Sequence, residues 1–372
     1  MNKKLIAAAV FGAMFAPVAM AQSANPVTLY GLLDLTFESV KAKGGVTPIG
    51  SRTRVTNQSS RLGVRGQEDL GGGVKAFFQI ETQVNPDDAC GQGGNPASGT
   101  LPNGGCAISG NGGKGFASRN SAVGFSGDFG SVLIGRWDTP YKLATIGLDP
   151  TGDVTMGAYT TVMHDSGNFD RRENNAVQYW TPNINGFNAR LHYSASEAKT
   201  QSTNPTTFSG SLAYTAKNFS VAYAYERHSN QAGSAAAASQ DANGNELGVS
   251  FTQGAFKFGV MLEKIRKTAT ADKNAFYVSA SMTQGMWNPY VSFGRFKDGG
   301  AVTATSDGRG GSARAFLLGA NYKLSGRTNL YGQVVRITNN DKAAANFGLN
   351  GLGGVAADND PSGFGVGVKH TF

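Results

Sequence analysis

The sequence predicts an all-β fold: a closed transmembrane β-barrel of about sixteen antiparallel strands. First, segments of roughly ten residues alternate apolar and polar side chains with a period of two, which is typical of strands. Second, short turns and long polar segments separate these strands in alternation. Third, no stretch after the N-terminal leader approaches the ~20 apolar residues of a membrane-spanning helix, so a closed barrel remains the way to pair the backbone in lipid.

The alternation gives each predicted strand one apolar and one polar face. A soluble β-sandwich would produce the same period, so this pattern alone does not choose between the two folds. The opposed faces are Val27, Leu29, Gly31, Leu33 and Leu35 against Thr28, Tyr30, Asp34 and Thr36; Phe187, Ala189, Leu191 and Tyr193 against Asn188, Arg190, His192 and Ser194; Phe219, Val221, Tyr223 and Tyr225 against Ser220, Ala222, Ala224 and Glu226; and Phe364, Val366, Val368, His370 and Phe372 against Gly365, Gly367, Lys369 and Thr371.

The spacing of turns and loops favours the barrel. Short turns at one rim and long loops at the other are typical of outer-membrane barrels, with the short turns periplasmic and the long loops external. Aromatic residues near segment ends are expected in girdles at the two membrane interfaces. The short turns are at 68–72, 127–130, 183–186, 217–218, 253–255 and 325–326, the long segments at about 85–117, 139–173, 229–244, 298–312 and 339–362, and the aromatics include Tyr30, Phe37, Tyr179, Trp180, Tyr214 and Tyr322.

The N-terminus has the features of a secretory signal peptide. Lys3 and Lys4 precede a short apolar run, and small residues at 19 and 21 form a cleavage site. We therefore expect residues 1–21 to be removed and residues 22–372 to form one barrel domain, since no linker or composition shift divides them. Removing the two lysines lowers the formal net charge from +8 to +6, because 8 − 2 = 6.

The basic balance does not indicate a nucleic-acid partner. An exported chain rarely meets nucleic acid, and no basic cluster with interleaved aromatics is present. A positive barrel interior that attracts anions fits the charge better.

Two cysteines, Cys90 and Cys106, lie in one Gly-, Asn- and Pro-rich segment. In an oxidising, exported context an even pair this close predicts a local disulfide that pins a loop, and two free thiols are the alternative.

Catalytic and metal sites are not predicted. The chain has four histidines, His164, His192, His228 and His370, and none accompanies a Gly-x-Ser-x-Gly elbow. No His or Cys spacing resembles a zinc site, and no Gly-rich turn leads from a strand into a phosphate-cradling helix. We expect no enzyme activity, no cofactor and no bound metal.

Several motifs in a fixed order resemble the general porins of Gram-negative bacteria, particularly those of β-proteobacteria. The resemblance covers essentially the whole mature chain. Each motif is weak alone, and their order makes the set specific. The motifs are Val27-Thr28-Leu29-Tyr30-Gly31-Leu32-Leu33-Asp34, Ser60-Arg61-Leu62-Gly63-Val64-Arg65-Gly66, Glu68-Asp69-Leu70-Gly71-Gly72-Gly73, Gly127-Asp128-Phe129-Gly130 leading to Gly135-Arg136, Asn174-Asn175-Ala176-Val177-Gln178-Tyr179, and the terminal Phe372.

The resemblance implies a sixteen-stranded outer-membrane barrel that assembles as a homotrimer and passes small hydrophilic solutes and ions by passive diffusion. It implies that the loop at about 139–173 folds inward as a constriction, although the Pro-Glu-Phe-Gly-Gly element of many enterobacterial relatives is missing. The cysteine-bearing loop is expected to reach a neighbouring subunit. Phe372 is expected to belong to the signal read by the barrel-assembly machinery.

The constriction is expected to carry fixed charges, because a low-dielectric wall focuses their field. The resemblance places Arg61, Arg136 and Arg172 on the wall, opposite the inward loop. Strand parity puts Arg61 and Arg65 on the inward face, since the intervening apolar positions take the other. Arg136 shares a face with apolar neighbours unless a bulge intervenes. The loop aspartates are Asp149, Asp153, Asp165 and Asp170, and further lumen cations are Lys75, which shares a face with Gln79 and Glu81, Arg119 and Arg190.

The function expected from these residues is a passive, anion-preferring outer-membrane channel. One alternative is a substrate-specific channel for a sugar or a carboxylate, which a ladder of aromatics along one wall would favour. An alternative of another class is a surface adhesin or interaction barrel that uses the long loops.

Overall fold

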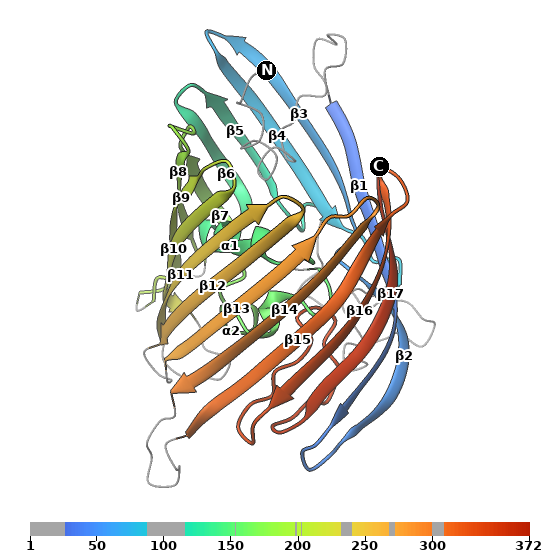
Figure 1. Cartoon of the computed structure of the whole chain (residues 1–372). Helices are drawn as coiled ribbons and strands as arrows, with labels where there is room; N and C mark the ends of the chain where they lie inside the picture. Colours follow the sequence, from blue (N-terminus) through green and yellow to red (C-terminus); the bar gives the residue numbers. More distant parts are fainter. Residues whose placement is uncertain are drawn as a thin grey trace, which may run out of the picture.

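A computed structural model describes residues 27–87, 116–152, 154–197, 199–201, 203–231, 240–267, 272–299 and 309–372. Its strands form one antiparallel sheet that curls into a barrel (Figure 1). No described helix is long and apolar enough to cross a membrane. The elements are β1 (Val27–Lys43), β2 (Ile49–Asn57), β3 (Arg61–Gly71), β4 (Val74–Gln83), β5 (Ser121–Gly127), β6 (Gly130–Asp138), α1 (Pro140–Thr145), η2 (Ile146–Leu148), η3 (Tyr159–Thr161), α2 (His164–Gly167), β7 (Arg172–Trp180), β8 (Phe187–Ala195), β9 (Thr206–Thr215), β10 (Phe219–Gln231), β11 (Gln240–Gln253), β12 (Phe256–Lys267), β13 (Lys273–Met282), β14 (Trp287–Gly299), β15 (Arg309–Lys323), β16 (Thr328–Asn339) and β17 (Asp360–Thr371).

The seventeen described strands occupy sixteen positions in the barrel. The first part of β1 pairs with β3 and its later part pairs with β2, so β2 and β3 together form one position, interrupted at 58–60. The other edge of β1 pairs with β17, which closes the sheet. All remaining neighbours along the chain pair antiparallel. The predicted sixteen-stranded closed barrel is confirmed.

The seam between β1 and β17 ends at the last residue of the chain. The backbone N–H of Phe372 donates to the carbonyl of Gly31 at 3.1 Å, and the N–H of Gly31 donates back at 3.0 Å. A Cβ on Gly31 would lie only 2.2 Å from Cζ of the Phe372 ring, so a larger residue there would displace the ring. Phe372 therefore completes the hydrogen-bond ladder and covers its end.

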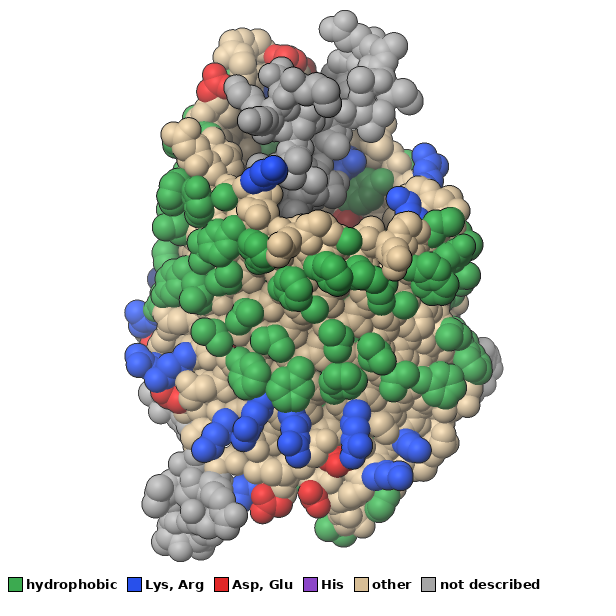
Figure 2. Space-filling view, viewed as in Figure 1, with side chains coloured by type: hydrophobic (Ala, Val, Ile, Leu, Met, Phe, Trp, Pro, Cys, Tyr) green, Lys and Arg blue, Asp and Glu red, His purple; other side chains and the backbone are tan. Residues whose placement is uncertain are grey.

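Side chains alternate between an outer apolar face and an inner polar face. On β1, Leu33 and Phe37 are 42% and 50% exposed, whereas Asp34, Thr36 and Glu38 are at most 1% exposed. The outward apolar side chains form a belt around the visible face of the barrel (Figure 2). Lipid covers such a belt in a transmembrane barrel, so the exposure measured on the isolated chain is exposure to hydrocarbon.

Two aromatics expected in the interfacial girdles point inward instead. The Tyr30 hydroxyl donates to Glu81 at 3.1 Å, and the Trp180 ring lies 5.1 Å below the guanidinium of Arg190. Their girdle assignment was wrong because nearness to a segment end does not fix the face, whereas strand parity does. Tyr179, one residue before Trp180, keeps the outward parity and bonds the carbonyl of Phe129.

Some strands run further than the predicted loops allowed. β10 continues to Gln231 and β11 begins at Gln240, inside the predicted segment 229–244. Likewise β15 begins at Arg309, inside 298–312. These ends are polar, so hydropathy does not reveal them, but backbone pairing extends the strands beyond the apolar belt. The signal peptide, Cys90, Cys106 and Asp153 lie outside the described residues.

A charge placed in the middle of the apolar belt should destabilise the barrel. Val260 lies midway along the outward face of β12 and is 40% exposed. We expect Val260→Arg to lower the free energy of unfolding in lipid vesicles by about 2–4 kcal/mol, measured by reversible denaturant titration. The control is Gln253→Arg on the outward face at the turn end of β11, where the cost should be about 0–1 kcal/mol because the side chain reaches headgroups. Equal losses for both variants would contradict the membrane placement of this belt.

Candidate functional site

The segment between β6 and β7 folds back into the barrel (Figure 1). Thr139 accepts a side-chain hydrogen bond from Lys142 N–H at 3.5 Å and caps α1, whose first residue is Pro140. Helix α1 contacts β9, β10 and β11, η2 contacts β11 and β12, and α2 contacts β12. The Thr139 N–H donates to the Arg171 carbonyl at 3.1 Å, so the two ends of the segment meet at the wall.

Apolar contacts attach this segment to one side of the lumen. Met156, Tyr159 and Met163 are fully buried and belong to one cluster with side chains of β12 to β16. Val162 of the segment lies close to the backbone of β14 at Gly294, where the wall has no side chain. A Cβ on Gly294 would lie 2.4 Å from Cγ2 of Val162. The segment therefore lies flat on that wall and leaves the wall of β3 to β7 facing the open lumen.

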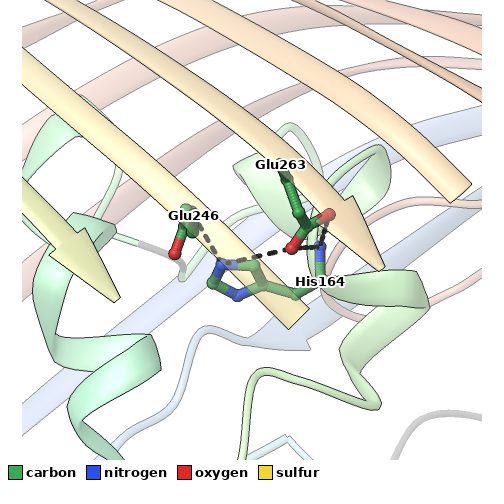
Figure 3. A group of neighbouring side chains, drawn as sticks. All are labelled: His164, Glu246 and Glu263. Atoms are coloured by element: carbon green, nitrogen blue, oxygen red, sulfur yellow. Dashed lines mark hydrogen bonds and ion pairs between the residues drawn. The ribbon is translucent and has the colours of Figure 1, made fainter. Parts of the chain in front are cut away.

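A buried polar group fixes the same segment (Figure 3). His164 Nε2 lies 3.0 Å from Oε1 of Glu246 on β11. The backbone N–H of His164 donates to both oxygens of Glu263 on β12, at 3.0 and 2.9 Å, and the Tyr141 hydroxyl donates to Glu263 at 2.9 Å. The ligand atoms of His164, Glu246 and Glu263 lie within 4.8 Å of one another, a spacing that suits a metal ion. Hydrogen bonds already join them, so the group forms an anchor without one.

The carboxylates around His164 favour its charged form. Burial by itself lowers the pKa of His164, but the charges of Glu246 and Glu263, the hydrogen bond between Nε2 and Glu246, and the Asp170 carboxylate 3.9 Å from Nδ1 raise it well above its usual range. An imidazolium between carboxylates thus links the inward segment to two strands of the wall.

Four arginines gather on the opposite wall and the rim beside it. Arg61 begins β3, Arg119 precedes β5, Arg136 lies in β6 and Arg172 begins β7. Glu81 of β4 joins the first two: its oxygens lie 3.6 Å from Arg61 Nε and 2.7 Å from Arg119 Nε. Arg172 is close enough for its charge to act on both Arg61 and Arg136. The structure brings together the three arginines expected at the constriction and adds Arg119.

A second carboxylate links this arginine group to the inward segment. Asp138, at the end of β6, lies 2.9 Å from Arg172 Nη2 and 4.0 Å from Lys142 Nζ of α1. Asn120 donates to Asp138 at 2.8 Å and accepts from Arg172 Nε at 2.6 Å. Lys142 also pairs with Asp170 at 2.9 Å. These contacts hold the Arg172 side chain and helix α1, at the start of the inward segment, in fixed relative positions.

The side-chain direction of Arg136 follows from a bulge. The pairing register of β6 and β7 shifts between Gly135 and Trp137, and Gly135 has φ 153°. The extra residue interrupts the strict alternation of side chains along β6. Arg136 therefore need not share the outward face of its apolar neighbours, as strict parity would require. The Arg136 Nε donates to the Ser118 carbonyl at 3.0 Å, and Nη1 donates to the Asn174 side chain.

The described loop aspartates hold the segment in shape. Asp149 is 5% exposed and accepts from the backbone N–H and hydroxyl of Thr151, at 2.9 Å each, and from the Tyr277 hydroxyl at 3.2 Å. Asp165 forms an ion pair with Lys267 of β12. Asp149 therefore presents little charge to the lumen, although it was expected among the loop aspartates opposite the wall arginines.

The remaining predicted cations are spread along the barrel. Arg65 lies over the Tyr30 ring at 5.1 Å, near the Arg61 end of the group. Lys75 is the second residue of β4, directly after the short turn, and is exposed. Arg190 is 7% exposed above Trp180. Lys75 lies at the turn rim, away from the arginine group.

Sequence reasoning missed the acids that hold the arginines. Glu81 and Asp138 are 7% and 6% exposed and each contacts two basic side chains. Glu81 shares an inward face with Gln79, which parity could signal. Asp138 follows the bulge, where parity fails, and no local signal places it.

The anchor at His164 predicts a pH dependence on the alkaline side. The pKa of His164 is raised in the folded state, so the stability that its charge contributes is fully present below the unfolded value of about 6.5. That contribution is lost as the pH rises through the folded-state pKa. We expect the frequency of brief partial closures in single-channel recordings to rise as the pH is raised through the alkaline range above about 7.

The control is His164→Ala, which should show frequent closures at every pH, with no further rise. An unchanged closure frequency in the natural protein over this range would contradict the anchoring role of the imidazolium.

Comparisons with known proteins agree with this architecture. The family model described as Gram-negative porin matches residues 6–342. Outer membrane porin protein 32 of Delftia acidovorans is 31% identical over 387 residues, covering 100% of both chains. Major outer membrane protein P.IB of Neisseria gonorrhoeae is 27% identical over 199 residues, covering 52% of this chain and 48% of its own.

Solved structures of outer-membrane proteins share the fold of this chain. The anion-selective porin from Comamonas acidovorans superposes with a TM-score of 0.73 at 25% identity, covering 94% of this chain and 100% of its own. The trimer form of OmpT of Vibrio cholerae has the same fold, with a TM-score of 0.63 at 15% identity over 94% and 100% of the two chains. The chain belongs to the Gram-negative porins, and its barrel is an outer-membrane channel for the passive diffusion of small hydrophilic solutes.

Proposed function

We propose that this channel prefers anions. The observation that supports it most directly is the charge balance of the arginine group. Arg61 and Arg119 pair with Glu81, Arg172 pairs with Asp138, and Arg136 lies within range of the charge of Asp138. Four positive charges less two negative charges give an excess of +2. A low-dielectric wall around a narrow lumen concentrates the field of this excess and raises the local anion concentration.

The residue type suits a selectivity element. A guanidinium stays charged at every physiological pH and is hydrated more weakly than an ammonium, so it exchanges water for an anion at lower cost. Glu81 and Asp138 hold these side chains in place through charge-assisted hydrogen bonds, which are shorter and stronger than neutral ones. An anion would therefore meet positioned donors and would leave readily, because the arginines are already partly compensated.

Assembly and processing are part of the same proposal. The chain is exported with residues 1–21 as a cleaved signal peptide, 22–372 forms the barrel, and the loop at about 139–173 narrows the pore. A homotrimer is supported by the trimer form recorded for OmpT of Vibrio cholerae, which shares the fold. A Cys90–Cys106 disulfide and recognition of Phe372 by the barrel-assembly machinery complete the proposal.

Removing two of the four arginines should weaken anion preference. We expect Arg61→Ala combined with Arg136→Ala to bring the balance to two against two and to move the zero-current potential under a KCl gradient toward zero. Lumen substitutions tune selectivity without unfolding a barrel, so conductance steps should persist. Lys75→Ala, which removes a cation at the turn rim, is the control and should leave the potential nearly unchanged. A cation-selective potential in the natural protein would overturn the proposal itself.

Neutralising the acid between two arginines should act in the opposite direction. Glu81→Gln keeps the shape of the side chain but raises the excess charge of the group from +2 to +3, by removing one negative charge. We expect the zero-current potential to move further in the anion-selective direction. A shift toward cation selectivity would show that Glu81 does not act at the narrow part of the pore.

A further inference from the structure

Three side chains of the buried anchor lie at the spacing of metal ligands (Figure 3). His164 Nε2 is 3.0 Å from Oε1 of Glu246 and 3.8 Å from Oε1 of Glu263. In a tetrahedral zinc site the ligand atoms are about 2.0–2.2 Å from the ion, which places neighbouring ligand atoms about 3.4 Å apart. The two observed distances bracket that value. An ion between the three groups would therefore require only small side-chain movements.

Two carboxylate oxygens in this region lack a hydrogen-bond donor. Among the described residues, Oε2 of Glu246 is buried without a partner, and so is Oε2 of Glu226 on β10, whose other oxygen lies 2.7 Å from His228 Nε2. Both glutamates are at most 1% exposed. The charges of Glu226, Glu246 and Glu263 all act on the Tyr141 hydroxyl, so the three acids surround one point. A desolvated carboxylate oxygen without a donor costs free energy, which a bound cation would offset.

The ammonium groups of the surrounding wall and segment have other contacts. Lys142 Nζ pairs with Asp170 at 2.9 Å. Lys273 Nζ lies 4.3 Å from the centre of the Phe296 ring. Within the described part of the chain, neither ammonium forms an ion pair with Glu246. The free oxygen of Glu246 is therefore left for a cation from solution.

The ligand types select the class of cation. An imidazole nitrogen with carboxylates suits zinc and its first-row neighbours, whereas Ca²⁺ takes about six to eight oxygen ligands. Ligating side chains in metal sites are usually held by a second layer of hydrogen bonds and carboxylates. Such a layer is present here: the Tyr141 hydroxyl donates to Glu263 at 2.9 Å, and an Asp170 oxygen lies 3.9 Å from Nδ1 of His164.

We propose that His164, Glu246 and Glu263 form a binding site for a divalent first-row transition metal, with Zn²⁺ as the reference ion. The metal replaces the proton between Nε2 and Glu246 in the hydrogen-bonded anchor, and that proton passes to water. Because one ligand belongs to the inward segment and two belong to β11 and β12, the ion ties the constriction to the wall. The two glutamates are 82 and 99 residues from His164, so no local spacing along the chain indicates the site.

The first test measures metal retention by the full-length barrel in detergent. The protein is loaded with ZnCl₂, dialysed against metal-free buffer and analysed by inductively coupled plasma mass spectrometry. We expect the natural protein to keep about one Zn²⁺ per chain and Glu246→Gln to keep less than about a tenth of that. The glutamine retains the shape of the side chain and still hydrogen-bonds a neutral His164, so the segment stays docked while the anionic ligand is lost.

Two controls accompany this measurement. Glu81→Gln removes a buried acid from the opposite wall, and it should retain zinc like the natural protein. Loading the natural protein with CaCl₂ should leave at least about tenfold less metal per chain than loading with ZnCl₂, because the site offers too few oxygens.

The second test records single channels at one fixed pH, first with EDTA and then with excess Zn²⁺. An ion that binds only the docked segment favours the docked state by mass action. We expect brief partial closures of the natural protein to become at least about fivefold rarer with Zn²⁺, and those of Glu246→Gln to stay unchanged.

Equal zinc retention by the natural protein and Glu246→Gln would overturn the proposal, because the ion would then bind elsewhere. Loss of zinc from the natural protein on dialysis would overturn it as well. Zinc retention without a change in closures would refute the tie between segment and wall. If Glu246→Gln forms no conductance steps, His164→Ala replaces it, since the backbone N–H of residue 164 still donates to Glu263.

Discussion

The requirement that every backbone N–H and C=O be paired in hydrocarbon governs the whole structure. A sheet with open edges would expose unpaired groups along each edge, so it must close upon itself. Closure here depends on β1, which pairs with β2 and β3 on one side and with β17 on the other. The final contact is the mutual hydrogen bonding of Gly31 and Phe372, where the absence of a Cβ lets the terminal ring lie against the strand.

A closed barrel of sixteen strands is too wide to fill with its own side chains, so its lumen takes its shape from the inward segment. Apolar packing and the His164 anchor place that segment on the wall of β9 to β16. This one-sided attachment explains why Asp149 and Asp165 are occupied in holding the segment. It leaves the arginine group on the other wall to dominate the electrostatics of the lumen.

Arginine serves the same barrel in two different environments. Inside, Glu81 and Asp138 hold the guanidinium groups and reduce their repulsion, which fixes their positions while keeping an excess of positive charge. Outside, Arg295 faces Arg314 across a strand pair without a described acid beside either. The difference follows from what lies next to each wall: water and mobile ions in the lumen, and lipid headgroups at the outer rim.

The sequence by itself determined the two-faced strands and the inward parity of Arg61 and Arg65, because a period of two is a local property of consecutive residues. The alternation of short turns with long loops, which is also readable along the chain, indicated the closed barrel. Only the tertiary structure decided the bulge at Arg136, the burial of Asp149 and the contact between Glu81 and Arg119, which are 38 residues apart. These features depend on inter-strand register and on how the inward segment docks. Both are set by contacts between residues distant in the chain, so no local pattern encodes them.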